Sequence, residues 1–176
     1  DFRSASTEAA IYLGINTSNQ VYLYVNGAIT ITTAAVSLSV WTHVALVRYS
    51  GTTKIYLNGT QSGSSWVDIT DYGTTKPLRI GAWFNALYGF TGYIDDVRIS
   101  KDAARYTATF TPPIVTFPGD NNTVLLLHFD GPDTSTTIID DGVTLQDLRT
   151  SAGGASTIIE TADYSEFGAE VRAIGS

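Results

Sequence analysis

The sequence of 176 residues contains no cysteine and no methionine. The absence of cysteine excludes disulfide frameworks, thiolate metal sites, cysteine nucleophiles and dithiol redox chemistry. No run approaches the ~18 apolar residues that span a bilayer, and no basic region followed by an apolar signal core opens the chain, so we expect no membrane insertion. Because the chain begins with Asp1 and lacks methionine, we expect a processed product or a portion of a longer polypeptide.

Positive charge is also scarce. Ten Lys and Arg stand against 17 Asp and Glu, which gives a formal net charge of -7. The imbalance is concentrated in residues 119–176, which carry two basic and ten acidic side chains, against eight and seven in residues 1–118. Nucleic-acid binding depends on clustered Lys and Arg, so we expect no nucleic-acid partner. A solvated acidic surface is the simpler interpretation of the excess.

Short strands joined by turns are predicted for the first two thirds of the chain. Runs rich in β-branched and aromatic residues are bounded by Gly, Asn and Ser. Two Asn-Gly pairs are the strongest hairpin signals, because both residue types tolerate positive φ. The predicted hairpins join residues 20–25 to 28–33 and residues 53–57 to 60–64, and residues 9–15 are a further strand candidate.

Residues 40–49 (VWTHVALVRY) form the longest β-rich run. Alternation places His43 and Val47 on one face and Val44 and Leu46 on the other, so both faces are partly apolar. A strand that is apolar on both sides belongs inside a stack of layers rather than in a lone solvated sheet.

The rest of the chain adds more short strands. A proline-containing exit at residues 109–122 cannot pair as a central strand. Residues 164–173 are compatible with a short helix or a strand. Further strand candidates are residues 77–82, 91–100, 124–129 and 157–161. Together these patterns predict an all-β fold, an antiparallel β-sandwich of the jelly-roll type.

Four segments carry a resemblance to one family. They are WTHVALVRYSGTTKIYLNGTQ (41–61), PLRIGA (77–82), FTGYIDDVRISKDAARYTATFTPP (90–113) and LLLHFDG (125–131). All four in kind, and the first three also in order, resemble segments of the concanavalin A-like lectin/glucanase family, in the laminin-G-like form found in phage and bacterial surface proteins. The resemblance implies a concanavalin A-like jelly roll over most of residues 10–131.

The order of these segments departs from the family in one respect. LLLHFDG usually opens such a unit, and here it comes last. Residues 1–118 therefore resemble a laminin-G-like unit that lacks its first strands, and residues 119–123 resemble a linker. Residues 124–176 then supply either the N-terminal strands of a second unit in a tandem array, which is the simpler history, or the strands that complete the same sandwich.

Catalytic constellations are absent from the sequence. Hydrolases of the family use a Glu-x-Asp-x-Glu-like strand, whose alternate carboxylates project together into a cleft, and no such strand occurs here. Gly-x-Ser-x-Gly, phosphate-binding-loop and His-Glu-x-x-His motifs are also missing. We therefore predict that the chain is not an enzyme. The glutamates, none of them within a clearly predicted strand, are Glu8, Glu160, Glu166 and Glu170.

Two histidines and an aspartate pair are predicted to be structural. His43 and His128 lie in apolar strand contexts, where a hydrogen-bonded core role is the more common one. Asp95 and Asp96 are adjacent, so their side chains should point to opposite faces, and pairing with an arginine such as Arg98 or Arg79 would satisfy them.

The metal content is left open and no cofactor is predicted, although calcium remains an alternative. Calcium takes six to eight oxygen ligands from flexible loops, and the acidic third of the chain has such oxygens without a recognised calcium spacing. The residues that carry them are Asp120, Asn121, Asn122, Asp130, Asp133, Asp140 and Asp141.

Aromatic residues in predicted loops are the best candidates for a binding site. A sugar ring commonly stacks on an exposed aromatic side chain while amides and carboxylates bind its hydroxyls. The competing interpretation is that these aromatics close the edge of the core or make a protein–protein contact. The candidate ligand-binding residues are Trp66, Tyr72, Trp83, Phe84, Asn85 and Tyr88.

The resemblance implies a non-enzymatic adhesion or recognition module of a larger virion protein, such as a tail fibre, or of an extracellular surface protein. The expected partner is a host-surface glycan or another virion protein, and a homo-oligomer or larger assembly would add multivalency. The alternative is a structural virion module without a sugar ligand. A third is a carbohydrate-binding domain attached to a secreted hydrolase.

Overall fold

The computed structural model describes residues 11–69, 77–83, 88–132, 138–142, 148–150, 156–159 and 167–175. These ranges contain β-strands and no helix, so none offers a helix long and apolar enough to cross a membrane. The strands are β1 (Ile11–Ile15), β2 (Gln20–Val25), β3 (Ala28–Ala35), β4 (Thr42–Tyr49), β5 (Thr52–Leu57), β6 (Thr60–Gln61), β7 (Trp66–Val67), β8 (Pro77–Ile80), β9 (Gly92–Lys101), β10 (Thr123–Leu127), β11 (Leu148–Thr150), β12 (Ser156–Ile159) and β13 (Phe167–Gly175).

A seven-stranded antiparallel sheet forms the centre of the molecule. Its order is β10-β9-β13-β4-β5-β6, and β7 pairs with β5. The late strand β13 pairs with both β4 and β9, and β10 pairs with β9. The segment 164–173, compatible with helix or strand by sequence, therefore contributes to a central strand. The division at residues 118 and 124 remains a prediction.

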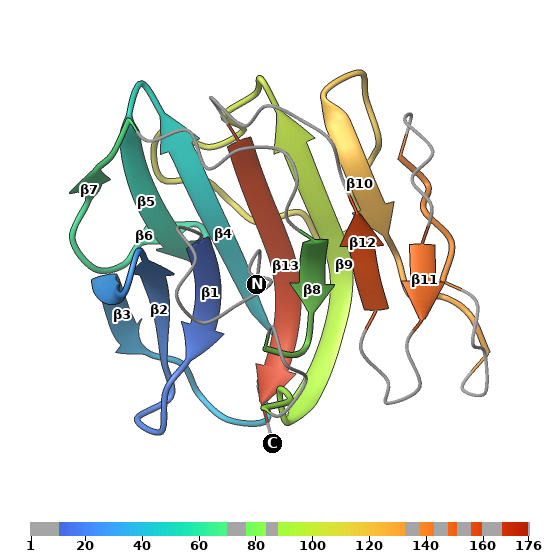
Figure 1. Cartoon of the computed structure of the whole chain (residues 1–176), viewed down its shortest axis with the longest axis horizontal. Helices are drawn as coiled ribbons and strands as arrows, with labels where there is room; N and C mark the ends of the chain where they lie inside the picture. Colours follow the sequence, from blue (N-terminus) through green and yellow to red (C-terminus); the bar gives the residue numbers. More distant parts are fainter. Residues whose placement is uncertain are drawn as a thin grey trace.

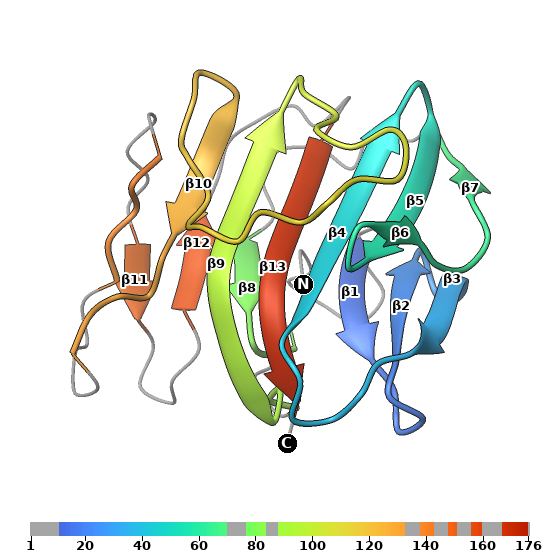
Figure 2. The same ribbon diagram turned by 180° about the vertical axis from the view of Figure 1, so that it is seen from behind.

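Smaller layers cover both faces of this central sheet. The three-stranded sheets β1-β2-β3 and β11-β12-β8 lie on one face (Figure 1). Residues 102–122, called the crossing segment below, run over β9, β13 and β4 on the opposite face (Figure 2). The predicted all-β class and antiparallel β-sandwich are confirmed.

Both Asn-Gly turns form as the sequence predicts. Asn26 and Gly27 have φ of 47° and 92° between β2 and β3, and Asn58 and Gly59 have φ of 48° and 82° between β5 and β6. Positive φ at both central residues is the geometry that matches the twist of the flanking strands. The strand after Asn58 is shorter than predicted, because β6 contains only residues 60–61.

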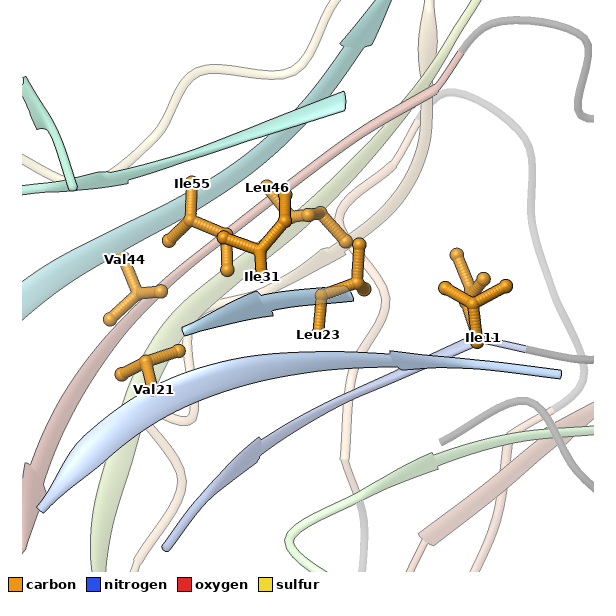
Figure 3. Close-up of a cluster of buried hydrophobic side chains, with 8 residues drawn as sticks. Ile11, Val21, Leu23, Ile31, Val44, Leu46 and Ile55 are labelled. Atoms are coloured by element: carbon orange, nitrogen blue, oxygen red, sulfur yellow. The ribbon is translucent and has the colours of Figure 1, made fainter. Parts of the chain in front are cut away.

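Strand β4 is buried on both faces, as its two-sided apolar pattern predicts. Val44 and Leu46 pack against Leu23 of β2 in a cluster between the central sheet and the β1-β2-β3 sheet (Figure 3). Val47 lies on the other face, in a cluster that Phe110 of the crossing segment covers.

A third cluster lies between β8 and the strands β9 and β10. It contains Leu78, Val97 and Leu125. Val171 of β13 packs against this cluster and also against the cluster under β1-β2-β3. The boundary between the two clusters is where the candidate site lies.

Candidate functional site

A cavity of about 390 Å³ lies between the β1-β2-β3 sheet, the β8–β9 connection and the central sheet. Its floor consists of apolar side chains of the central sheet, namely Val44, Ile94, Val171 and Ala173. Pockets that bind small molecules are concave, mostly apolar and about 300–1,000 Å³ in volume. The size and the lining of this cavity therefore suit a small ligand or one sugar unit.

Five aromatic residues line the cavity, namely Tyr12, Tyr22, Trp83, Tyr88 and Phe90. The ring of Trp83 lies 4.7 Å from that of Tyr88, edge to face, and 6.0 Å from that of Tyr12. Tyr88 is 64% exposed, whereas Tyr12 is 5% exposed. The hydroxyl groups of Tyr12 and Tyr22 are 2.9 Å apart. Tyr88 therefore presents its ring to solvent, whereas the ring of Tyr12 is buried and its hydroxyl contacts that of Tyr22.

The β8–β9 connection brings Trp83 and Tyr88 together by folding back on itself. The amide of Trp83 donates to the carbonyl of Tyr88 at 3.1 Å, and the amide of Phe90 donates to that of Gly81 at 2.7 Å. Gly81 has a φ of 76°, which favours glycine. Backbone bonds therefore fix the positions from which the two aromatic side chains project.

Polar groups are few in the cavity wall. Besides the hydroxyls of the lining tyrosines, Ser37 and Thr42 contribute hydroxyls, and Arg79 is the only charged side chain among the described lining residues. A few polar groups of this kind can orient a ligand by hydrogen bonding, while most of the contact between the ligand and the cavity would be apolar.

The structure brings two of the six predicted site residues together. Trp83 and Tyr88 both line the cavity. Trp66 lies elsewhere, in β7, where it packs against the buried cluster that contains Leu23 and Leu46. A ligand-binding role of Trp66 stays a prediction. Tyr72, Phe84 and Asn85 lie outside the described residues.

Sequence reasoning missed the tyrosines of β1 and β2. Tyr12 stacks on Tyr24 at 4.9 Å and meets Tyr22 edge to face at 5.6 Å. The sequence did contain a signal for this aromatic cluster, because Tyr22 and Tyr24 are two residues apart in a predicted strand and therefore lie on the same face of it. Gly14 leaves room for this group, since a Cβ there would lie 2.8 Å from the ring of Tyr22.

A separate cluster of charged groups lies on the opposite face of the central sheet. Glu170 of β13 is 4% exposed, and it accepts hydrogen bonds from Arg98 Nε at 2.6 Å and from the Tyr106 hydroxyl at 2.8 Å. His43 Nε2 lies 3.1 Å from the same carboxylate, so the predicted hydrogen-bonded role of His43 is confirmed. Glu170 lies in β13, within the segment 164–173 for which the sequence left helix and strand open because the residues around it showed no clear alternation.

The protonation of this cluster follows from its contacts. Burial raises the pKa of Glu170, but hydrogen bonds from His43 and Tyr106 and the charge of Arg98 more than offset it, so the pKa lies below its ordinary value. Burial and the neighbouring Glu170 charge raise the pKa of Tyr106 to about 12. The cluster is therefore an ion pair completed by a neutral phenol.

Asp96 has a structural partner, but a different one from the arginines predicted. Its carboxylate lies 3.2 Å from Arg172 Nη1 and 2.8 Å from His128 Nδ1, whereas Arg98 pairs with Glu170. The pairing prediction is wrong in its partner because β9 carries an extra residue opposite β13, with a positive φ of 50° at Asp96. The structural role predicted for His128 is confirmed by this bond.

The acidic residues named above as calcium candidates do not gather in the described ranges, which contain no group of three or more His, Asp or Glu that could hold a metal ion. Asp120 pairs with Arg105 at 2.7 Å, and Asp140 accepts hydrogen bonds from the amides of Leu126 and Gly142. Asp133 lies outside the described residues. Calcium binding stays a prediction.

The Arg105–Asp120 pair predicts acid sensitivity. The hydrogen bond from Arg105 holds the pKa of Asp120 well below its ordinary value of 3.8. A lowered carboxyl pKa adds stability above the unfolded-state pKa and loses it as the pH falls through the folded-state pKa. We expect the free energy of unfolding to fall less steeply below pH ~4 in Asp120→Asn than in the wild type.

Urea denaturation at a series of pH values measures this slope. Asp102→Asn, at an exposed position outside the pair, is the matched control. Identical slopes for Asp120→Asn and the wild type would contradict the prediction.

Comparison with known proteins gives one match. A family model described as the concanavalin A-like lectin/glucanases superfamily matches residues 2–107. This range covers more than half of the chain, and it includes strands β1 to β9 and both Trp83 and Tyr88. No curated protein and no solved structure matches the chain.

Proposed function

The chain belongs to the concanavalin A-like lectin/glucanase superfamily, and from this premise we propose that it is a non-enzymatic recognition module that binds a glycan. The observation that carries the proposal is the cavity in which the exposed ring of Tyr88 lies beside Trp83. Exposed aromatic rings offer flat apolar faces to sugars, and the hydroxyls of Ser37 and Thr42 are hydrogen-bonding groups in the same wall.

The placement of Glu170 supports a role without catalysis. A retaining glycosidase needs two carboxyl groups about 5–5.5 Å apart that reach the substrate. Glu170, the only glutamate among the described residues, is closed off from solvent and bound by Arg98, Tyr106 and His43. A carboxylate so engaged is a poor acid or nucleophile, and it lies on the face of the sheet away from the cavity.

The resemblance of residues 90–113 and 125–131 to phage and bacterial surface modules supports a virion or extracellular location. We therefore propose that the glycan belongs to a host surface and that the module is one part of a tail fibre, appendage or surface protein. Assembly into an oligomer would raise avidity, because weak single sites gain from multivalency.

A structural role in assembly without a sugar ligand is the second candidate. The observation that favours it is a set of exposed apolar side chains at the β4–β5 turn and β7, formed by Tyr49, Val67 and Ile69. Exposed apolar groups of this kind suit a protein–protein contact.

Substitution of the cavity aromatics tests glycan binding. In a glycan array followed by calorimetric titration of the best ligand, Tyr88→Ala and Trp83→Ala should each weaken binding by about tenfold or more, because each removes apolar contact area. Tyr93→Ala is the matched control, since Tyr93 is 70% exposed and does not line the cavity.

Trp66→Ala distinguishes packing from binding. It should lower the stability of the fold and leave the affinity unchanged, because Trp66 contacts the core cluster and not the cavity. We expect equal binding with calcium and with EDTA. Absence of binding to any glycan would favour the structural alternative.

A further inference from the structure

The interior of the cavity differs chemically from its opening. Trp83 and Tyr88 border the outer part, and Tyr88 is largely exposed. The floor presents the methyl groups of Val44, Val171 and Ala173. Val21 and Val44, which face each other across the two sheets in Figure 3, both line the cavity.

This division restricts which sugars can enter. An unsubstituted hexose carries hydroxyl groups around its ring, and each buried hydroxyl without a partner costs free energy. The valines and the alanine of the floor offer no hydrogen-bond partner. A methyl group entering the same space would lose no hydrogen bond and would gain apolar contact.

We propose that the interior of this cavity binds the methyl group of a modified sugar, either the C6 methyl of a 6-deoxyhexose or the methyl of an N-acetyl group. This inference rests on the proposed function and names the ligand class for the same site. The sugar ring lies against Tyr88 and Trp83 at the opening, and its methyl-bearing substituent points to Val171 on the floor. Ser37 and Thr42 bind ring hydroxyls that stay near the wall.

Matched pairs of methyl glycosides provide the test. L-Fucose differs from L-galactose only by the missing O6 hydroxyl, and N-acetyl-D-glucosamine differs from D-glucose by its acetamido group in place of a hydroxyl. In titrations followed by NMR, we expect the methyl-bearing member of at least one pair to bind about tenfold more tightly, as for a group that fits an apolar pocket.

A substitution in the cavity lining tests the contact with the methyl group separately from sugar binding in general. Val171, toward which the methyl group points, lines the cavity, and Val171→Thr replaces one of its methyl groups with a hydroxyl of similar size. We expect this variant to reduce the preference for the methyl-bearing sugar about threefold or more, since the loss of apolar contact is combined with a polar group in the wall. Val67→Thr, at a 74% exposed position outside the cavity, is the matched control.

The outcomes separate this inference from the proposed function. Equal affinity within both pairs would overturn the methyl-binding inference, while sugar binding that depends on Tyr88 would still support a glycan-binding module. A preference that Val171→Thr leaves unchanged would overturn the placement of the methyl group. Absence of binding to any sugar would overturn both proposals.

Discussion

Glu170→Ala is expected to lower the free energy of unfolding by about 3–5 kcal/mol, the range observed when one partner of a buried ion pair is removed. Glu170 is 4% exposed and pairs with Arg98, which is equally buried. Its removal leaves the guanidinium charge of Arg98 without a counter-ion in the interior. Tyr106 also loses the acceptor of its hydroxyl hydrogen bond.

Chemical denaturation of Glu170→Ala, Glu170→Gln and the wild type measures this effect. Glu170→Gln keeps the shape and part of the hydrogen bonding, so its loss should be smaller than that of Glu170→Ala. Asp102→Asn, at an exposed site whose φ of 55° asparagine tolerates, should change the free energy of unfolding by less than about 0.5 kcal/mol. A loss of under 1 kcal/mol in Glu170→Ala would contradict the assignment of Glu170 as the charge partner of Arg98.

Gly59→Ala is expected to destabilise the fold by about 2–5 kcal/mol, through two effects that add. Gly59 has a φ of 82°, where any side chain is strained. A Cβ at this position would also overlap the carbonyl oxygen of Phe110 in the crossing segment, and backbone atoms cannot rotate away. The amide of Phe110 donates to the Gly59 carbonyl at 3.0 Å, so displacement would break this bond too.

The chain supplies a matched control in Gly27→Ala. Gly27 occupies the equivalent position of the other Asn-Gly turn, with a φ of 92°, but an added Cβ there would meet only the Tyr24 hydroxyl at 4.0 Å. Gly27→Ala should therefore cost only the backbone strain, about 1–2 kcal/mol. If thermal or urea denaturation gave equal losses in the free energy of unfolding for the two variants, the predicted steric overlap with the crossing segment at Gly59 would be contradicted.

Features that depend on nearby residues could be predicted from the sequence. Asn26-Gly27 and Asn58-Gly59 form turns because positive φ is a property of the residues themselves. Alternation within β4 predicted burial on both faces, since side chains of a strand alternate whatever it pairs with.

The candidate site was predicted only in part. Trp83 and Tyr88 were expected in a binding loop because they lie within six residues of one another in an aromatic-rich connection, and a local backbone turn brings them together. Trp66 looked equivalent by composition but packs on the core. Tyr12 and the floor residue Val171 belong to strands distant in the sequence, so no local pattern connects them to Trp83.

The sequence by itself therefore determined the all-β class, the two Asn-Gly hairpins, the buried character of β4 and the family to which the chain belongs. Only the tertiary structure decided that β13 lies between β4 and β9, that Arg98 pairs with Glu170 while Arg172 pairs with Asp96, and that residues distant in the sequence line a largely apolar cavity together with Trp83. The physical reason is the range of the interactions. Turn geometry and strand alternation act between neighbouring residues, whereas strand order, register and cavity shape depend on contacts between residues that the chain separates widely.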